Sequence, residues 1–395
     1  MQALLNKIHN DLYAAGITNE ALSEIWGVAP SNVSRVFKGH TQISFCYLTK
    51  TLLRLYEDQV LRRNLVQKYL QYAKPENIKE AMEYFSFRGE FEMLQGLIAK
   101  EKERIALKKE EKEKNEEKFI PSNDEEWINV YELIYRRHTE GEQFSLEDFD
   151  EELEEMRFKA SSKEMESLID ILRCQTAYQL RDYRMLLKRM KKIEKRLSQV
   201  KNKFLRASFS VRLKEGMNAV LLMDDKVLEI RENSFELLEI CNSELNFIIQ
   251  RANAHYNIAE SYIFENYVQS NYHFEKALHV LSESPYSQGV ERKRKAIERT
   301  LNFLKIYHAK DLDNLKGDLD HPEQAFLAIR QGNNKLALKI LDDIEKEKGY
   351  LNHFSTFYLG LAKNDVRLIE KSLEMFIKNN SNFYAKLPKL YLGID

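Results

Sequence analysis

Apolar residues recur at helical spacing, about three to four residues apart, along almost the whole chain from Leu4 onward. Short polar or glycine-containing segments interrupt this pattern in the first quarter of the chain, at Gly16, Gly27, residues 38–40, residues 74–75 and residues 88–89. Helices usually stop at such breaks. The pattern therefore predicts five short helices before residue 74, followed by a helical hairpin made of residues 76–86 and 90–107.

Breaks of the same kind recur after Pro121. They predict turns near residues 139–141, 161–162, 182, 223–225, 269–270, 332–334 and 363–365. Turns spaced about 20 to 45 residues apart are typical of a solenoid of helical hairpins, in which each hairpin buries its apolar face against its neighbours.

Individual hairpins resemble tetratricopeptide repeats, although none matches the full pattern. In HYNIAESYIFENYVQSNYHFEKALHV (residues 255–280), small Ala259 and Ala277 stand where two helices must approach closely, and Tyr262, Phe274 and Leu278 surround them. The segment IRQGNNKLALKIL (residues 329–341) repeats the turn and the second helix. The second half of the chain is therefore expected to form a tetratricopeptide-like superhelix.

The sharpest local signal is NEALSEIWGVAPSNVSRVFKG, residues 19–39. Leu22 and Trp26 lie one turn apart on a first helix, and Gly27 takes the turn that follows. Val33 and Val36 then lie on the inner side of a second helix. This spacing predicts a helix-turn-helix, with two departures from the usual pattern. Trp26 stands where alanine is common, and Ala29 replaces the usual capping hydroxyl.

The second helix of this motif has a polar outward face. Pro30 fits its first turn and Gly39 ends it. Short polar groups and two cations point outward, as a helix in the major groove requires, and they are the candidate DNA-binding residues: Ser31, Asn32, Ser34, Arg35 and Lys38. A duplex operator is the partner that this face predicts.

Charge is distributed unevenly along the chain. Residues 1–74 carry nine Lys/Arg against five Asp/Glu, a net charge of +4, whereas the whole chain carries −1 and the remainder therefore −5. Fifteen of the nineteen residues in 100–118 are charged, with alternating signs that allow ion pairs three and four residues apart. We interpret this segment as a solvated helix end that runs into a linker closed by Pro121.

Composition supports an all-α fold. Gly (13) and Pro (6) are scarce in 395 residues, which disfavours turn-rich sandwiches and barrels. Three parts are predicted: a helix-turn-helix DNA-binding head at 1–74, linking helices and a charged segment at 75–121, and a tetratricopeptide-like domain at 122–395, to which the resemblance given below assigns peptide binding and dimerisation.

Several classes of protein are disfavoured. The motifs GxGxxG, GxSxG, HExxH and the Walker loop are absent, so neither an enzyme nor a cofactor is predicted. The cysteines are Cys46, Cys174 and Cys241, too far apart for a zinc site or a disulfide framework. The chain lacks a signal-peptide-like start and the roughly 18 apolar residues of a membrane span, so we expect a soluble cytoplasmic protein.

Two further basic runs lie at residues 188–192 and 291–295. Acidic residues are interleaved with them, so they are more typical of solvated helix faces than of nucleic-acid contacts.

Beyond these local signals, the chain resembles the arbitrium receptors (AimR) of Bacillus phages, relatives of the quorum-sensing regulators that join such a head to a tetratricopeptide body. The resemblance is carried by EYFSFRGEFEMLQGLIAKE (83–101), VYELIYRRHTEGEQFSLEDFDEEL (130–153), KEMESLIDIL (163–172) and the closing block LALKILDDIEKEKGYLNHFSTFYLGLAKNDVRLIEKSLEMFIKNNSNFYAKLPKL (336–390). It implies a homodimer that binds an operator without its peptide, activates a neighbouring gene and promotes lytic growth.

The resemblance also implies that a hexapeptide ending in Arg-Gly-Ala binds the concave face and switches the protein off, favouring lysogeny. Amide side chains can satisfy the backbone of an extended peptide. The candidate peptide-binding residues are Asn218, Arg251 for the peptide carboxylate, Asn257, Gln324, Asn352 and Asn382. This chain departs from the family at SNFYAKLP, where Ser381 and Asn382 replace the aspartate that holds the peptide's arginine.

Dimerisation is expected at a small apolar patch near the carboxy terminus, formed by Leu387, Leu390, Tyr391, Leu392 and Ile394. One alternative function stays open. The same kind of body also serves in peptide-controlled modules that bind a partner protein, and in that case the head would grip a protein instead of DNA.

Overall fold

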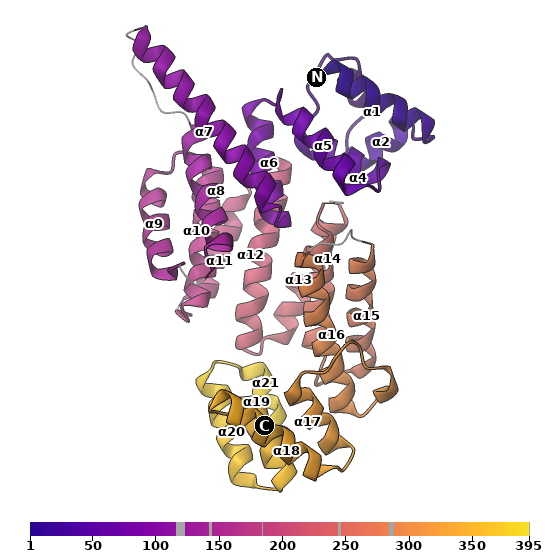
Figure 1. Ribbon diagram of the computed structural model, residues 1–395, viewed down its shortest axis with the longest axis vertical. Coiled ribbons are helices and arrows are strands. Elements are labelled where there is room, and N and C mark those ends of the chain that lie inside the picture. The colour runs from indigo at the N-terminus through magenta and orange to yellow at the C-terminus, as the bar shows by residue number, and fades with distance from the viewer. Residues whose placement is uncertain (116–122, 142–143, 184, 244–245, 284–287, 395) are drawn as a thin grey trace. The chain divides into compact units, whose positions relative to one another are not determined.

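The computed structural model describes residues 1–115, 123–141, 144–183, 185–243, 246–283 and 288–394. Every regular element in these ranges is a helix (Figure 1). The prediction of an all-α fold is therefore confirmed. The chain divides into two compact units, which we call unit 1 (Met1–Leu213) and unit 2 (Lys214–Asp395).

Unit 1 begins with the five short helices that the sequence predicts. Its helices are α1 (Gln2–Ala14), α2 (Asn19–Trp26), α3 (Pro30–Phe37), α4 (Phe45–Leu55), α5 (Gln59–Leu70), α6 (Pro75–Arg88), α7 (Phe91–Lys114), α8 (Asn123–Thr139), α9 (Leu146–Lys159), α10 (Lys163–Gln179) and α11 (Leu186–Leu197), followed by the first half of α12 (Lys203–Met223). Helix α6 packs against both α7 and α8, and α8 packs against α9 and α10. Contacts between a helix and the next but one are typical of stacked hairpins.

Side chains of α6 bind the start of α4 and so attach the first five helices to the rest of unit 1. The backbone N–H groups of Phe45 and Cys46 donate to Asn77 Oδ1 and Glu80 Oε2, both at 3.0 Å. These N–H groups lie in the first turn of α4, where no helical carbonyl is available. Asn202 donates to the other oxygen of Glu80 at 2.7 Å.

Unit 2 continues with hairpins. After the second half of α12 its helices are α13 (Val227–Asn242), α14 (Ile248–Ser261), α15 (Tyr267–Ser282), α16 (Gln288–His308), the short 3₁₀ helix η2 (Leu312–Asn314), α17 (His321–Arg330), α18 (Asn334–Lys348), α19 (His353–Lys363), α20 (Val366–Lys378) and α21 (Asn382–Leu392). Helix α14 packs against α13, α15 and α16, and α17 packs against α18 and α19.

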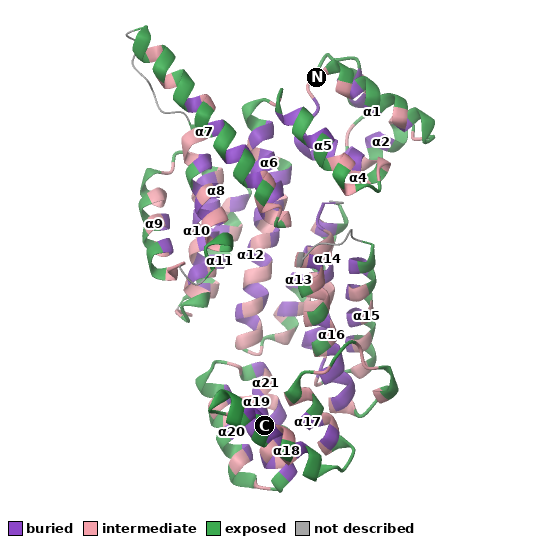
Figure 2. Ribbon diagram, in the orientation of Figure 1, coloured by how far each residue is buried: buried purple, intermediate pink, exposed green. Residues whose placement is uncertain are grey.

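Figure 2 shows buried positions along the inner sides of these helices. As the repeat pattern predicts, Ala259, Phe274 and Ala277 are fully buried where α14 meets α15. Their small and flat side chains allow the close approach that a hairpin requires.

One predicted turn is wrong. Gln269 and Ser270 lie inside α15, and the turn between α14 and α15 comes earlier, at residues 262–266. Asn266 starts the helix, because its Oδ1 accepts a hydrogen bond from the Gln269 N–H at 3.1 Å. Ser270 is buried and donates to the Ala259 carbonyl at 2.7 Å, so its polarity serves helix packing. The other predicted turns fall between helices.

The charged segment that begins at Lys100 is bound to its neighbour and not merely solvated. Helix α7 continues to Lys114, and its cations form ion pairs with the acidic first turns of α8. Lys109 lies 2.7 Å from Glu125, and Arg104 lies 3.1 Å from Asp124. Pro121 and the proposed boundary at 121/122 lie outside the described residues, so the three-part division of the chain stays a prediction.

Candidate functional site

The helix-turn-helix is held by local capping and a small buried interface. Thr18 Oγ1 accepts a hydrogen bond from the Ala21 N–H at the start of α2 (3.2 Å), and Gly27 follows α2 with φ +66°. That left-handed conformation favours glycine. Val33 and Val36 on α3 are buried against the rest of the head. The two helices and the turn predicted for residues 19–39 are therefore present.

Trp26 is large because it joins α2 to α4. Its indole Nε1 donates to Thr51 Oγ1 at 3.0 Å, and its ring stacks on Tyr47 with centroids 5.0 Å apart. Only 4% of Trp26 is exposed. A bulky residue at this position thus extends the core of the head without altering the motif.

The outward face of α3 is open to a partner. Ser31, Asn32, Arg35 and Lys38 are exposed, and Ser34 is partly exposed. Arg35 and Lys38 form no ion pair with any described residue, so both cations remain available. At the end of α3, Gln2 Nε2 donates to the Phe37 carbonyl at 3.0 Å, which fixes α1 beside this helix.

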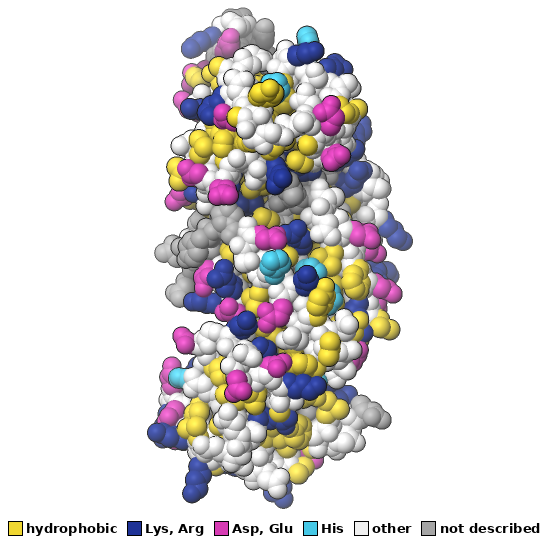
Figure 3. All heavy atoms as spheres, turned by 90° about the vertical axis from the view of Figure 1, so that its right-hand side faces the viewer, with side chains coloured by type: hydrophobic (Ala, Val, Ile, Leu, Met, Phe, Trp, Pro, Cys, Tyr) yellow, Lys and Arg dark blue, Asp and Glu magenta, His cyan; other side chains and the backbone are white. Residues whose placement is uncertain are grey.

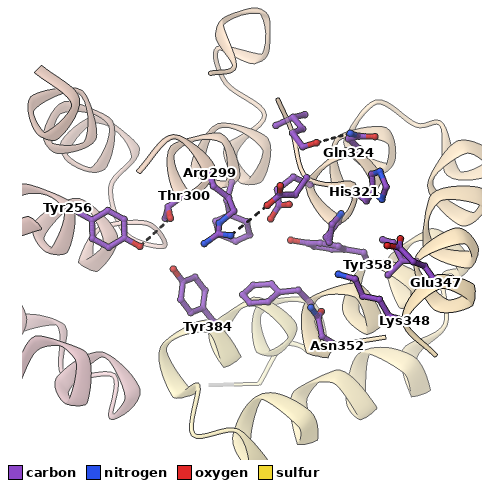
Figure 4. A pocket seen from close by; sticks show the side chains of 17 residues that line it. Tyr256, Arg299, Thr300, His321, Gln324, Glu347, Lys348, Asn352, Tyr358 and Tyr384 are labelled. Carbon is purple, nitrogen blue, oxygen red and sulfur yellow. Dashed lines mark hydrogen bonds and ion pairs between the residues drawn. The ribbon is translucent and has the colours of Figure 1, made fainter. Parts of the chain in front are cut away.

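Unit 2 contains a pocket of about 760 Å³, within the range of small-ligand sites (Figure 4). Segments far apart in the sequence build it. The lining residues are Tyr256 from α14, Arg299, Thr300 and Phe303 from α16, Leu319 and Asp320 from the following loop, His321, Pro322, Glu323 and Gln324 from α17, Ile344, Glu347 and Lys348 from α18, Asn352, Phe354 and Tyr358 at and in α19, and Tyr384 from α21.

Charges of both signs line the pocket. Arg299 lies 3.7 Å from Asp320 near its middle, and Glu347 and Lys348 lie at one end (Figure 4). Burial raises the pKa of Glu323, and the neighbouring Asp320 raises it further. The pocket therefore suits a ligand that carries both a cation and an anion, because each charge meets an opposite one.

The other end of the pocket is aromatic and backed by a buried carboxyl group. The hydroxyl groups of Tyr384 and Tyr256 donate to Glu260 Oε1 at 2.5 Å and 3.2 Å. Tyr256 also hydrogen bonds to Thr300 at 3.2 Å (Figure 4). Burial raises the pKa of Glu260 although both hydrogen bonds and nearby Lys293 favour the charged form. Two pocket-lining phenol groups are thereby fixed in place.

Two of the candidate peptide-binding residues lie in this pocket. Gln324 is exposed and its Nε2 donates to the Leu319 carbonyl at 2.7 Å. Asn352 is exposed and its Oδ1 accepts from the Ser355 N–H at 2.9 Å, so it also caps α19.

The other four candidates lie outside the pocket lining. Asn218 is buried between α12 and α13, donating to Ser234 and accepting from Asn233. Arg251 forms an ion pair with Glu283 at 2.7 Å. Asn257 is half-buried on α14, and Asn382 is exposed at the first turn of α21.

The sequence did not identify most of the residues that line the pocket. Tyr256, Arg299, Lys348 and Tyr384 come from four helices and share no spacing in the sequence. The one sequence signal for the pocket is the large number of aromatic residues between 256 and 384. This signal is ambiguous, because aromatic residues also form ordinary core.

The predicted carboxy-terminal patch is partly internal. Leu387 is fully buried, so it belongs to the core of unit 2 and not to the surface. Leu390, Tyr391 and Ile394 are about half exposed, and Tyr391 also packs edge-on against Phe357 with centroids 5.3 Å apart. Leu392 is partly buried.

Among the described residues there is no group of three His, Cys, Asp or Glu side chains able to hold a metal ion. Nor does any described helix have the length and apolarity that a membrane span requires.

These features define a class of protein, in which an amino-terminal helix-turn-helix is joined to a pocket-bearing body of stacked helical hairpins. Within that class the chain belongs to the AimR transcriptional regulator-like family, whose model matches residues 62–392. The family is regulatory, which confirms the prediction that the chain is not an enzyme. The matched residues begin after the helix-turn-helix.

Similar proteins agree with this assignment. An uncharacterized protein of Bacillus anthracis is 34% identical over 245 residues, which cover 61% of this chain and 90% of that protein. A solved structure of selenomethionine phAimR superposes with a TM-score of 0.75 at 21% identity, covering 99% of this chain and 96% of the other. A structure of phAimR with a ligand gives 0.64 at 21% identity, covering 88% and 96%. At this identity the two structures confirm the superhelical fold.

Proposed function

We propose that this protein is a DNA-binding transcriptional regulator, switched by a short peptide that binds in the pocket of unit 2. One observation supports the DNA-binding part of this proposal. Val33, Val36 and Phe37 of α3 are buried in the head, and its outward face consists of small polar groups and two cations that form no ion pair with any described residue. Such a face gives hydrogen bonds to base edges and charge for phosphates.

The pocket supports the peptide-binding half. An extended peptide places many backbone amides in a groove, where each needs a partner once water is displaced. Gln324 and Asn352 each offer a donor and an acceptor there. Arg299 and Lys348 suit the peptide carboxylate, and Asp320, Glu323 and Glu347 suit a cationic side chain. These three acids compensate for the missing aspartate before the Leu-Pro of α21.

Because the chain belongs to this family, we extend the proposal to its biological role. We infer that the dimer without peptide activates a gene in the lysis–lysogeny decision of a phage, and that a hexapeptide switches it off in the host cytoplasm. The switch requires that the peptide bind better to the form that cannot hold the operator. A coupling free energy of about 1–3 kcal/mol is enough. Scattering profiles with and without peptide distinguish a change of dimer geometry from dissociation.

The DNA-binding test starts with selection of a preferred duplex from a random pool. Arg35→Ala with Lys38→Ala should weaken binding to that duplex by about 1–3 kcal/mol for each lost contact. The matched control removes two exposed cations from α4 and α5 through Arg54→Ala with Lys68→Ala. Equal affinity in both variants, or a selection that yields no duplex, would favour the alternative of a partner-protein module.

The peptide test uses calorimetry with free hexapeptides that end in Arg-Gly-Ala. Asn352→Ala should weaken binding by about 1–3 kcal/mol, because a peptide amide loses its partner. Asn333→Ala is the matched control, since Asn333 caps α18 as Asn352 caps α19 but does not line the pocket. Both variants lose a cap, worth about 1 kcal/mol of stability. Only the first should lose affinity, and equal affinities would exclude this pocket.

A further inference from the structure

Helix α11 presents a strongly basic face that the proposed function has not yet used. Between residues 188 and 206 there are nine Lys or Arg residues and one acid, Glu194. The exposed cations of this stretch are Lys188, Arg189, Lys191, Lys192, Lys195, Lys201 and Lys203. Figure 2 marks the outward side of α11 as exposed. One acid therefore stands among nine basic residues in this stretch.

The two faces of α11 are cleanly separated. Four of its five apolar residues, Leu186, Met190, Ile193 and Leu197, are each at most 3% exposed, and Leu187 is partly exposed. Lys188, Lys192 and Lys195 follow one another at spacings of four and three residues, so they form a stripe on the opposite side. Because these four apolar residues are already used in the core, the lysine stripe on the opposite side acts through charge. Insertion into a membrane would need free apolar side chains.

Four of these cations have no partner among the residues that the structure describes. Lys188, Arg189, Lys192 and Lys195 form no ion pair or hydrogen bond with any described residue, whereas Arg196 is bound to Asp170 at 2.5 Å. Figure 3 shows a different surface, on which basic and acidic side chains are mixed. An uncompensated stripe of like charge costs self-repulsion, which a bound polyanion would remove.

An acidic surface of a second copy is the nearest alternative, and α9 is the richest in acids. Most of its acids are already paired, however. Asp150 lies 3.2 Å from Arg173, and Glu152 lies 3.0 Å from Arg136. Three exposed acids of α9, Glu147, Asp148 and Glu151, have no ion pair with a described residue, fewer than the four free cations of α11.

We propose that the outward face of α11 is a second DNA-contacting surface, which binds phosphates without reading sequence. Residues 188–195 span about 10 Å of helix, and duplex DNA carries one charge for about every 1.7 Å of its axis. The stripe thus meets a run of phosphates of comparable length. The identification of the polyanion as DNA rests on the proposed function of the head, while the charge stripe itself does not.

The test compares two variants with the same change of net charge. One replaces Lys188, Arg189, Lys192 and Lys195 with Gln. The other replaces four exposed lysines of unit 2 that have no described ion pair: Lys335, Lys339, Lys371 and Lys378. Binding of a random-sequence duplex of about 40 base pairs is measured from about 50 to 200 mM KCl, because the slope of log affinity against log salt counts phosphate contacts.

Neutralising the α11 stripe should reduce that slope by about 2–4 and weaken binding at least about tenfold at low salt. The unit 2 variant should change neither. Equal slopes in the two variants overturn the proposal. A loss of molecular mass in light scattering with an unchanged slope also overturns it and assigns the stripe to a second copy.

The proposed function of the head is tested separately. Arg35→Ala with Lys38→Ala should reduce the preference for the selected duplex over random DNA. The α11 variant should weaken binding to both duplexes by the same factor. Unchanged preference in the head variant, together with a reduced slope in the α11 variant, would contradict only the proposed function of the head. Lost preference in the head variant, together with an unchanged slope in the α11 variant, would contradict only this inference.

Discussion

Gly360 lies in the middle of α19, where this helix crosses α20. A Cβ at this position would lie 2.8 Å from Ile369 Cγ1, 3.0 Å from the Ile369 backbone nitrogen and 3.2 Å from Leu368 Cβ. The backbone nitrogen cannot move without shifting α20. Gly96, in contrast, lies in α7 with nothing within 4 Å of its added Cβ.

The two glycines should therefore respond oppositely to the same change. Gly96→Ala should stabilise unit 1 by about 0.5–1 kcal/mol, since alanine favours helix. Gly360→Ala should destabilise unit 2 by about 1–3 kcal/mol through overpacking. Hydrogen exchange of amides in α7 and α19 measures both effects. Stabilisation by both substitutions would show that α19 and α20 are less closely packed than described.

The buried carboxyl group of Glu260 predicts that stability depends on pH. Because burial raises its pKa above the ordinary 4.5, the folded state favours the neutral carboxyl group. Its contribution to stability is therefore complete below pH 4.5 and is lost as pH rises through the raised pKa. Glu260→Gln should keep an acceptor for Tyr384 and remove this loss.

Hydrogen exchange of α14 at pH 4.5 and 7 measures the difference between wild type and Glu260→Gln. We expect the variant to gain stability relative to the wild type as pH rises. A constant difference across this range would mean that Glu260 titrates normally.

At the scale of elements, α12 is attached to α6 by a buried ion pair. Arg212 Nε lies 2.8 Å from Glu83 Oε1, and Glu83 is completely buried. Tyr131 donates to the second oxygen of Glu83 at 2.8 Å, and Ser208 also binds the carboxylate. Three helices thus share one charge, and removal of the arginine would leave it uncompensated.

Arg212→Met should consequently lower the stability of unit 1 by about 3–5 kcal/mol. The matched control is Arg136→Met, which breaks an exposed pair with Glu152 and should cost less than about 1 kcal/mol. Both tryptophans of the chain, Trp26 and Trp127, lie in unit 1, so their fluorescence during urea unfolding reports on that unit. Similar costs in the two variants would contradict the special role of the buried pair.

At the scale of the whole molecule, dimerisation remains a prediction that rests on the exposed part of the carboxy-terminal patch. Leu390→Glu with Ile394→Glu should convert a dimer into the 46.8 kDa chain, because charge at an apolar interface must be desolvated. Light scattering measures the mass. Leu336→Glu with Val366→Glu, two apolar residues exposed on α18 and α20, is the control. An unchanged dimer in the first variant would place the interface elsewhere.

Local signals predicted the helices well. Gly27 with its positive φ, Pro30 and the apolar spacing of Val33 and Val36 located the helix-turn-helix, because each of these signals acts within one or two turns. The turn at residues 269–270 was misplaced for a reason that is not local. Serine is common in turns, and only the tertiary structure shows that Ser270 is buried and hydrogen bonded to Ala259.

The sequence by itself determined the all-helical class, the helices of the helix-turn-helix, and which face of α3 is polar, because helical periodicity and capping depend on neighbours in the chain. Only the tertiary structure decided that Tyr256, Arg299, Lys348 and Tyr384 share a pocket, and that Gly360 cannot be replaced without strain. These properties arise from contacts between helices far apart in the sequence, and a single sequence does not record how such helices pack.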